Sequence, residues 1–119
     1  MLRPELRRIS PNDYDGWEAF EAAELTDPWN AFGWFVLDIG LAGEKGTTLF
    51  QILVSTRAAV SRALGDDKAR RFLIVDSFEP HLLEKALKDH VSSQEGHTWD
   101  EIVGRLRRNM YWEYEKQWS

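Results

Sequence analysis

Cysteine is absent from this 119-residue sequence, which excludes a disulfide framework, a thiolate zinc site and a cysteine nucleophile. Long apolar runs are absent too, because none approaches the roughly 20 residues that a membrane-spanning helix needs. The first residues, Met1-Leu2-Arg3-Pro4-Glu5, lack the apolar core of a secretory signal peptide. We therefore expect a soluble cytoplasmic protein that does not use a membrane as a partner.

The residues that would carry catalysis are scarce. The three histidines, His81, His90 and His97, match no zinc spacing, and the first two stand nine residues apart, so they point in different directions on one helix. No glycine-rich phosphate loop and no Gly-x-Ser-x-Gly turn occurs. The acidic run after Asn12 lacks the glycine and the final glutamate of a calcium loop. The sequence thus predicts no enzyme activity, no cofactor and no metal site.

Basic residues are missing from one long stretch. Between Ile9 and Glu44 there is no Lys or Arg, eight acids occur there, and the net charge of the chain is −5. The rest of the chain therefore carries −5 minus −8, or +3. This asymmetry argues against nucleic acid as a partner and suits a basic protein partner. An acidic surface that serves only solubility is the other interpretation.

Continuous and alternating apolar patterns predict four to five strands. These strands are residues 2–9, 30–40, 47–55, 72–75 and 111–115. A short link with two glycines joins the second and third as a hairpin. Pro4 confines the first strand to an edge or a strand start, whereas residues 72–75 are too apolar for an edge and predict a central strand. The last strand alternates and puts Trp112 and Tyr114 on one face.

Capping residues and apolar spacing predict the helices. The first two are residues 16–25, with Asp15 as cap, and residues 57–64, capped by Thr56. The third is capped by Ser77, has Pro80 in its first turn and buries Leu82, Leu83, Ala86, Leu87 and Val91. The fourth starts with the capping box Thr98-Trp99-Asp100-Glu101 and carries the apolar stripe Trp99, Ile102, Val103, Leu106 and Met110. Residues 16–25 lack a clean apolar stripe, so a surface helix and a loop both remain open. The chain predicts one α+β domain over residues 1–119, an antiparallel-rich sheet of four to five strands with two to three helices packed mainly on one face.

Six tryptophans exceed what a core of this size needs. Trp34, Trp99 and Trp112 lie in apolar patterns and are interpreted as core residues. The other three, Trp17, Trp29 and Trp118, stand in polar surroundings, which is the composition of interface hot spots. The alternative, for each of these, is that it covers the edge of the core from a loop.

The C-terminal stretch is the most distinctive part of the sequence. The helix start Thr98-Trp99-Asp100-Glu101 and the ending Tyr111-Trp112-Glu113-Tyr114, together with the strands around Glu5–Ile9, Phe50–Thr56 and Arg71–Val75, resemble the immunity protein 8 family of bacterial polymorphic-toxin systems. The chain departs from the family at Arg57, where members often have proline. The resemblance implies a non-enzymatic protein that binds a cognate toxin domain. It also implies that the shared motif, Thr98, Trp99, Glu101, Trp112, Glu113 and Tyr114, holds the fold and does not contact the partner.

Specificity for one toxin is then expected in the unusual acidic part of the chain. The candidate partner-binding residues are Asp13, Asp15, Trp17, Glu18, Glu21, Glu24, Asp27 and Trp29. Their charge would suit a basic toxin surface, such as the nucleic-acid cleft of a nuclease. The alternative function is a non-catalytic regulatory or scaffold subunit of a housekeeping complex, in which these acids only solubilise. The oligomeric state is not indicated.

Overall fold

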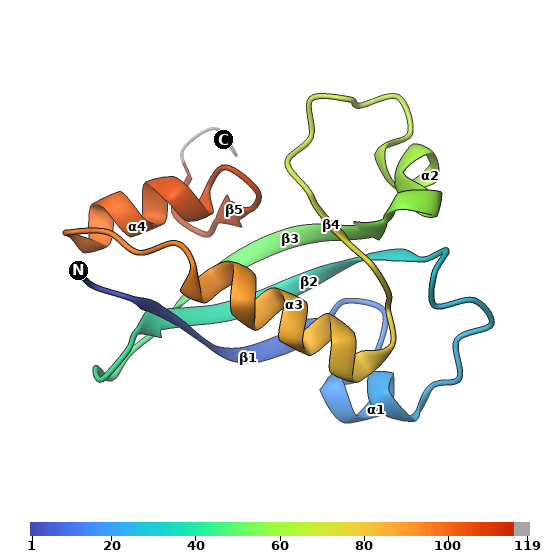
Figure 1. The fold of residues 1–119 in the computed structure, drawn as a ribbon, viewed down its shortest axis with the longest axis horizontal. Coiled ribbons are helices and arrows are strands. Elements are labelled where there is room, and N and C mark those ends of the chain that lie inside the picture. The colour runs from blue at the N-terminus through green and yellow to red at the C-terminus, as the bar shows by residue number, and fades with distance from the viewer. Residues whose placement is uncertain (116–119) are drawn as a thin grey trace.

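A computed structural model gives an α+β fold and describes residues 1–115 (Figure 1). In chain order the elements are β1 (Pro4–Pro11), α1 (Trp17–Ala22), β2 (Phe32–Leu41), β3 (Thr48–Thr56), the 3-10 turn η1 (Arg57–Ala59), α2 (Val60–Leu64), β4 (Leu73–Val75), α3 (Pro80–Ser92), α4 (Trp99–Leu106) and β5 (Tyr111–Trp112). The predicted α+β class and antiparallel-rich sheet are confirmed.

The sheet is built on a three-stranded antiparallel meander of β1, β2 and β3. The other edge of β3 is shared, because β4 pairs in parallel with its end and β5 pairs antiparallel with its start. The hairpin register places Phe35 opposite Ile52 and Leu37 opposite Phe50. Because side chains alternate along a strand, these four residues share one face of the sheet.

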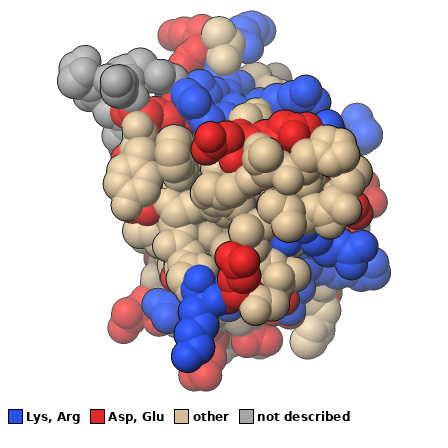
Figure 2. Space-filling model, turned by 90° about the vertical axis from the view of Figure 1, so that its left-hand side faces the viewer, with Lys and Arg blue, Asp and Glu red and all other residues tan. Residues whose placement is uncertain are grey.

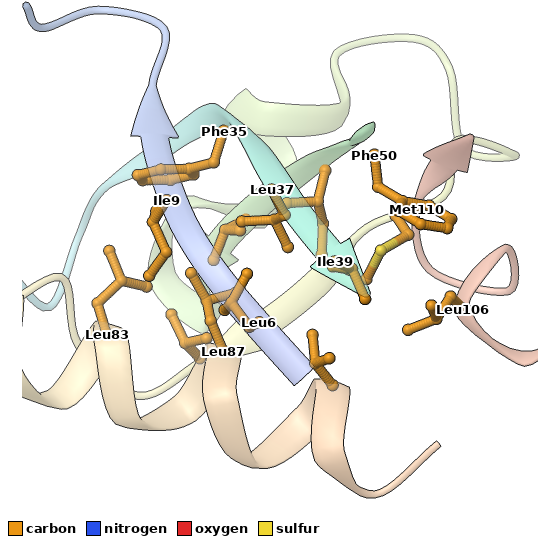
Figure 3. Packing of buried hydrophobic residues seen from close by; sticks show 14 of the residues in the cluster. Leu6, Ile9, Phe35, Leu37, Ile39, Phe50, Leu83, Leu87, Leu106 and Met110 are labelled. Carbon is orange, nitrogen blue, oxygen red and sulfur yellow. The ribbon is translucent and has the colours of Figure 1, made fainter. Parts of the chain in front are cut away.

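Helices α1, α3 and α4 cover that face. In Figure 3, Leu83 and Leu87 of α3 project toward Leu6 and Ile9 of β1, with Leu37 behind them. The other residues of this core that are at most 2% exposed are Phe20, Phe35, Ile39, Phe50, Ile52, Val54, Val91, Ile102, Leu106 and Met110. The apolar stripe predicted for α4 therefore points into the core.

The opposite face of the sheet is covered only in part. Leu53 and Ser55 point to this side by alternation and are fully buried. Ala59 and Ala63 of the η1–α2 segment are buried as well, and Figure 1 shows this segment beside the end of β3. Trp34, which pairs with Leu53 on this face, is only half-buried and does not pack against the core cluster, so the interpretation of Trp34 as a core residue is wrong.

The strand of residues 72–75 is also placed differently from its prediction. β4 lies at the edge of the sheet, next to β3 alone, and Ile74 remains 39% exposed. The neighbours of Ile74 in β4, Leu73 and Val75, pack on the core side. This packing accounts for the apolar composition of β4 although the strand is not central in the sheet. β5 is shorter than predicted, because the chain turns after Trp112 and the amide of Glu115 donates to the Trp112 carbonyl.

Two helix predictions need correction at their capping residues. α3 begins at Pro80 with Glu79 as its cap, because buried Ser77 instead accepts a hydrogen bond from the Glu79 amide. Thr56 occupies the N-cap position of η1 as predicted, but its side chain makes no capping hydrogen bond, because its Oγ1 accepts from the Ala31 amide and donates to the Ala31 carbonyl. Each hydroxyl thus serves a tertiary or turn contact that sequence spacing does not reveal.

The remaining differences concern α1 and one side chain of α3. α1 spans six residues and starts after Gly16, whose φ of 92° suits glycine, and Asp15 does not cap it. Leu82 is 53% exposed and does not belong to the buried side of α3. Among residues 1–115 no helix is both long and apolar enough to cross a membrane.

Candidate interaction surfaces

The acidic segment, residues 13–29, surrounds α1 and continues into the loop before β2. All six of its carboxylate residues are exposed: Asp13, Asp15, Glu18, Glu21, Glu24 and Asp27. Within the part of the chain that the structure describes, none of them forms an ion pair. Asp27 is the one whose side chain has a structural task, since its Oδ1 accepts a hydrogen bond from the Trp29 amide at 3.1 Å. The other carboxylates are left facing solvent.

The aromatic residues of the acidic segment divide into anchors and one exposed ring. Phe20 is 2% exposed, and its ring meets those of Tyr14 and Trp17 at centroid distances of 5.3 and 5.0 Å. Trp17 is half-buried and packs on the core, so it covers the core edge. Trp29, by contrast, is 65% exposed. Trp118 lies outside the described residues.

Hydrogen bonds of the residues before and after Trp29 hold its loop against the rest of the protein. The Phe78 amide donates to the Pro28 carbonyl at 2.8 Å, and Arg62 Nη1 donates to Asn30 Oδ1 at 2.6 Å. The Asn30 amide also closes a turn on the Asp27 carbonyl. The exposed indole is therefore presented by a held backbone, which lowers the entropy lost when a partner binds it.

The C-terminal segment, residues 97–115, uses its polar side chains in a different way. Thr98 Oγ1 accepts from the Glu101 amide at 3.1 Å, and Glu101 Oε2 accepts from the His97 amide at 3.2 Å, which together cap α4. Trp99 is half-buried beside the core. These residues of the motif are thus occupied with the start of one helix.

The second half of the motif fastens β5 to β3. Glu113 Oε1 accepts from Thr48 Oγ1 at 2.6 Å and from the Leu49 amide at 3.0 Å, and these bonds lower the pKa of Glu113. Trp112 Nε1 donates to the same Thr48 hydroxyl at 3.0 Å. The Tyr114 ring meets the Trp112 ring edge-on at 5.2 Å but is itself 66% exposed.

A buried carboxylate, which the sequence patterns did not indicate, closes the C-terminal segment. Glu115 Oε1 accepts from Arg71 Nη1 at 2.5 Å, from Arg107 Nε at 2.8 Å and from the Trp112 amide at 3.1 Å. Burial acts to raise the pKa of Glu115, and these donors outweigh it, so the pKa is lowered. No local pattern identifies this cluster, because Arg71 is 44 residues away in sequence.

The turn between β2 and β3 is organised by Arg7, which sits at a bulge of β1. Its guanidinium donates to the carbonyl oxygens of Leu41, Glu44 and Gly46. A side chain at position 40 would place its Cβ 2.3 Å from the Gly46 oxygen, so only glycine allows this close approach. Sequence reasoning did not single out Arg7.

A shallow hollow of about 420 Å³ lies between this turn and α4. Its lining includes Ile39, Leu41, Glu44 and Trp99. Figure 2 views this end of the molecule, where uncharged surface occupies the middle of the face and charged side chains gather around it. No set of convergent catalytic groups lines the hollow.

Of the three histidines, His90 is half-buried and the other two are exposed. Burial lowers the pKa of His90, and a hydrogen bond with the Asn109 side chain acts against this shift. His90 Nε2 is buried and has no hydrogen-bond partner among residues 1–115. Over the same residues, no group of three or more His, Cys, Asp or Glu side chains is arranged to hold a metal ion.

Comparison with known proteins assigns the chain to a family. Neither a curated protein nor a solved structure matches the chain. The family model described as Immunity protein 8 matches residues 5–117, nearly the whole chain and the whole of the C-terminal motif. The chain therefore belongs to the immunity protein 8 family, whose members are immunity proteins of toxin systems.

Proposed function

We propose that this protein is the cytoplasmic immunity partner of a bacterial polymorphic toxin and neutralises the toxin domain by binding to it and covering it. Family membership supports a toxin as the partner. The observation that carries the mode of binding is the combination of six exposed carboxylate residues, which form no ion pair within residues 1–115, with the exposed indole of Trp29 beside them. Such a surface combines long-range charge with an apolar anchor.

The acidic segment would meet a basic toxin surface, such as the nucleic-acid cleft of a nuclease. Complementary charge raises association rate constants from about 10⁵–10⁶ M⁻¹s⁻¹ toward 10⁸ M⁻¹s⁻¹ or more at low salt. The acids are well placed for this role, because burying them against cations breaks no ion pair among residues 1–115. Phe20 and Trp17 keep the segment on the core while its carboxylates face outward.

The first experiment is co-expression with the toxin domain encoded beside this protein. We expect a stable complex on purification and rescue of growth in cells that otherwise die from the toxin. Absence of both complex and rescue, with this protein folded and present in excess, would end the proposal.

The second experiment locates the interface. Reversal of charge at Glu18, Glu21 and Glu24 to lysine should slow association with the toxin at least tenfold at low salt and flatten its salt dependence. A matched control reverses three exposed acids elsewhere, Asp66, Asp76 and Asp100. Equal association rates for the two triple variants, measured by stopped flow, would move the interface away from the acidic segment.

A further inference from the structure

The face of the sheet opposite the core carries an apolar row that residues 1–115 leave only partly covered. The row, here named the open sheet face, consists of Phe32, Trp34 and Val36 on β2, Leu49 on β3 and Tyr111 on β5. Phe32 and Leu49 are each 40% exposed, and the Trp34 and Tyr111 rings lie 6.1 Å apart. Leu53 and Ser55 on the same side are fully buried, whereas the residues of this row are exposed or half-buried.

Arginine side chains lie over the rings of this face. The Cζ atoms of Arg62, Arg70 and Arg71 lie 5.5, 5.7 and 4.7 Å from the ring centroids of Phe32, Trp34 and Tyr111, respectively. Such contacts orient guanidinium groups while leaving their N–H donors able to bind carboxylates.

Within residues 1–115, two of these arginines have no ion-pair partner or only a weak one. Arg62 forms no ion pair within residues 1–115, and its guanidinium donates to the side-chain and backbone oxygens of Asn30. Arg70 meets Asp67 at 3.5 Å in an exposed pair, a type that contributes little. Arg71 is different, since Glu115 already binds it. Arg62 and Arg70 are therefore the cations that a partner can engage.

The open sheet face is also hollowed and continuous with the proposed interface. A depression of about 240 Å³ is lined by Val36, Leu49, Tyr111 and their neighbours, and it can receive an apolar side chain. At its other end the row begins at Phe32, three residues after exposed Trp29, and Arg62 bonds the intervening Asn30. A partner seated on Trp29 thus reaches this row without leaving the surface.

We propose that the open sheet face is the second part of the toxin interface and binds an apolar patch of the toxin bordered by carboxylates. This inference rests on the proposed function, because it assigns a second contact to the same toxin. Trp, Tyr and Arg are the residues that dominate binding energy at protein interfaces. Carboxylates of the toxin would pair with Arg62 and Arg70, while its apolar side chains fill the depression beside Tyr111.

Aromatic rings and arginines on a sheet also suit single-stranded nucleic acid. The surroundings favour protein, because the acidic segment ends three residues before the row begins and Asp38 and Glu113 stand at the far end of the row. These carboxylates would repel a phosphate backbone.

The test compares two double variants of the full chain. Arg62→Glu with Arg70→Glu should weaken the complex with the cognate toxin domain at least tenfold, mainly through faster dissociation. The matched control, Arg105→Glu with Arg108→Glu on and just after α4, changes the same charge away from this face and should leave affinity within twofold. A third variant, Leu49→Lys, should also weaken binding at least tenfold. Thermal unfolding establishes that all variants are folded.

The outcomes separate the two proposals. If the wild type binds the toxin and the Arg62/Arg70 and Leu49 variants bind as tightly, the open sheet face is not part of the interface and the proposed function still holds. If the folded wild type does not bind, the proposed function fails and this inference fails with it. Binding of a single-stranded oligonucleotide by the wild type, lost in the Arg62/Arg70 variant, would assign the face to nucleic acid and overturn the inference.

Discussion

The acidic segment and the C-terminal segment contain the same residue types, glutamate and tryptophan, and use them in opposite ways. In the C-terminal segment Glu101, Glu113 and Glu115 each accept hydrogen bonds from the protein itself. In the acidic segment Asp27 is the one carboxylate that accepts a hydrogen bond from another group within residues 1–115. The tryptophans differ in the same way, because Trp112 is hydrogen-bonded and half-buried while Trp29 is 65% exposed.

This difference separates the residues that hold the fold from those available to a partner. A carboxylate that is already bonded inside the protein must lose those bonds before it can bind anything else. An exposed, unpaired carboxylate loses only its hydration. The C-terminal motif is thus suited to be common to a family, and the acidic segment to be specific to one partner.

The largest effect on stability in this comparison is expected from Phe20→Ala. Phe20 is the one residue of the acidic segment that is fully buried, and it meets Phe35 and Phe78. Its loss should lower the free energy of unfolding by about 3–5 kcal/mol. Denaturant unfolding measures this change. A loss below about 1 kcal/mol would mean that the acidic segment is not anchored through this ring.

The two tryptophans provide the next test. Trp29→Ala should weaken toxin binding by about 2 kcal/mol or more and change stability by less than about 0.5 kcal/mol. Trp112→Ala should instead cost at least about 1 kcal/mol of stability, because it removes packing and the bond to Thr48. Calorimetric binding and thermal unfolding of both variants make the comparison. Equal losses of binding in two folded variants would contradict the separation of roles.

The carboxylates should show the same separation at a smaller scale. Glu115→Ala leaves Arg71, Arg107 and the Trp112 amide without their shared acceptor and should cost about 1–3 kcal/mol of stability. Glu21→Ala, at an exposed site of α1, should change stability by less than about 0.5 kcal/mol.

The pH dependence of the Glu115 effect has a definite sign. The pKa of Glu115 is lowered on folding, so its contribution is present above its ordinary value of 4.5 and is lost as pH falls through the folded pKa. The wild type and Glu115→Ala should therefore converge in stability at acid pH. A difference that persists undiminished well below pH 4 would contradict the role of the charged carboxylate.

The smallest effect is expected at His90, which lies in neither the acidic segment nor the C-terminal segment. Its pKa is lowered on folding, so the unfolded chain binds the proton first as pH falls below the ordinary value of 6.5. Stability should be full above that pH and decline as pH falls toward the folded pKa. His90→Gln should flatten this part of the stability profile. An unchanged slope between pH 6.5 and 5 would assign the pH dependence to other groups.

Local patterns were sufficient for much of the fold. The capping box at Thr98, the apolar stripe of α4 and the hairpin of β2 and β3 depend on neighbours within a few residues or on a short link, which is why they could be predicted. The position of Trp34 could not, because a strand that is apolar on both sides does not reveal which side a helix covers.

The sequence by itself determined the α+β class, the absence of thiol chemistry and the cluster of acids without a base, since these follow from composition and short-range periodicity. Only the tertiary structure decided which charged side chains of the protein are engaged in ion pairs and which remain available to a partner. Glu115 is bound because Arg71, distant in sequence, is brought to it, and the arginines over Phe32 and Trp34 arrive from the segment after β3. Pairing of charges depends on distance in space, and distance in space is set by the packing of the whole chain.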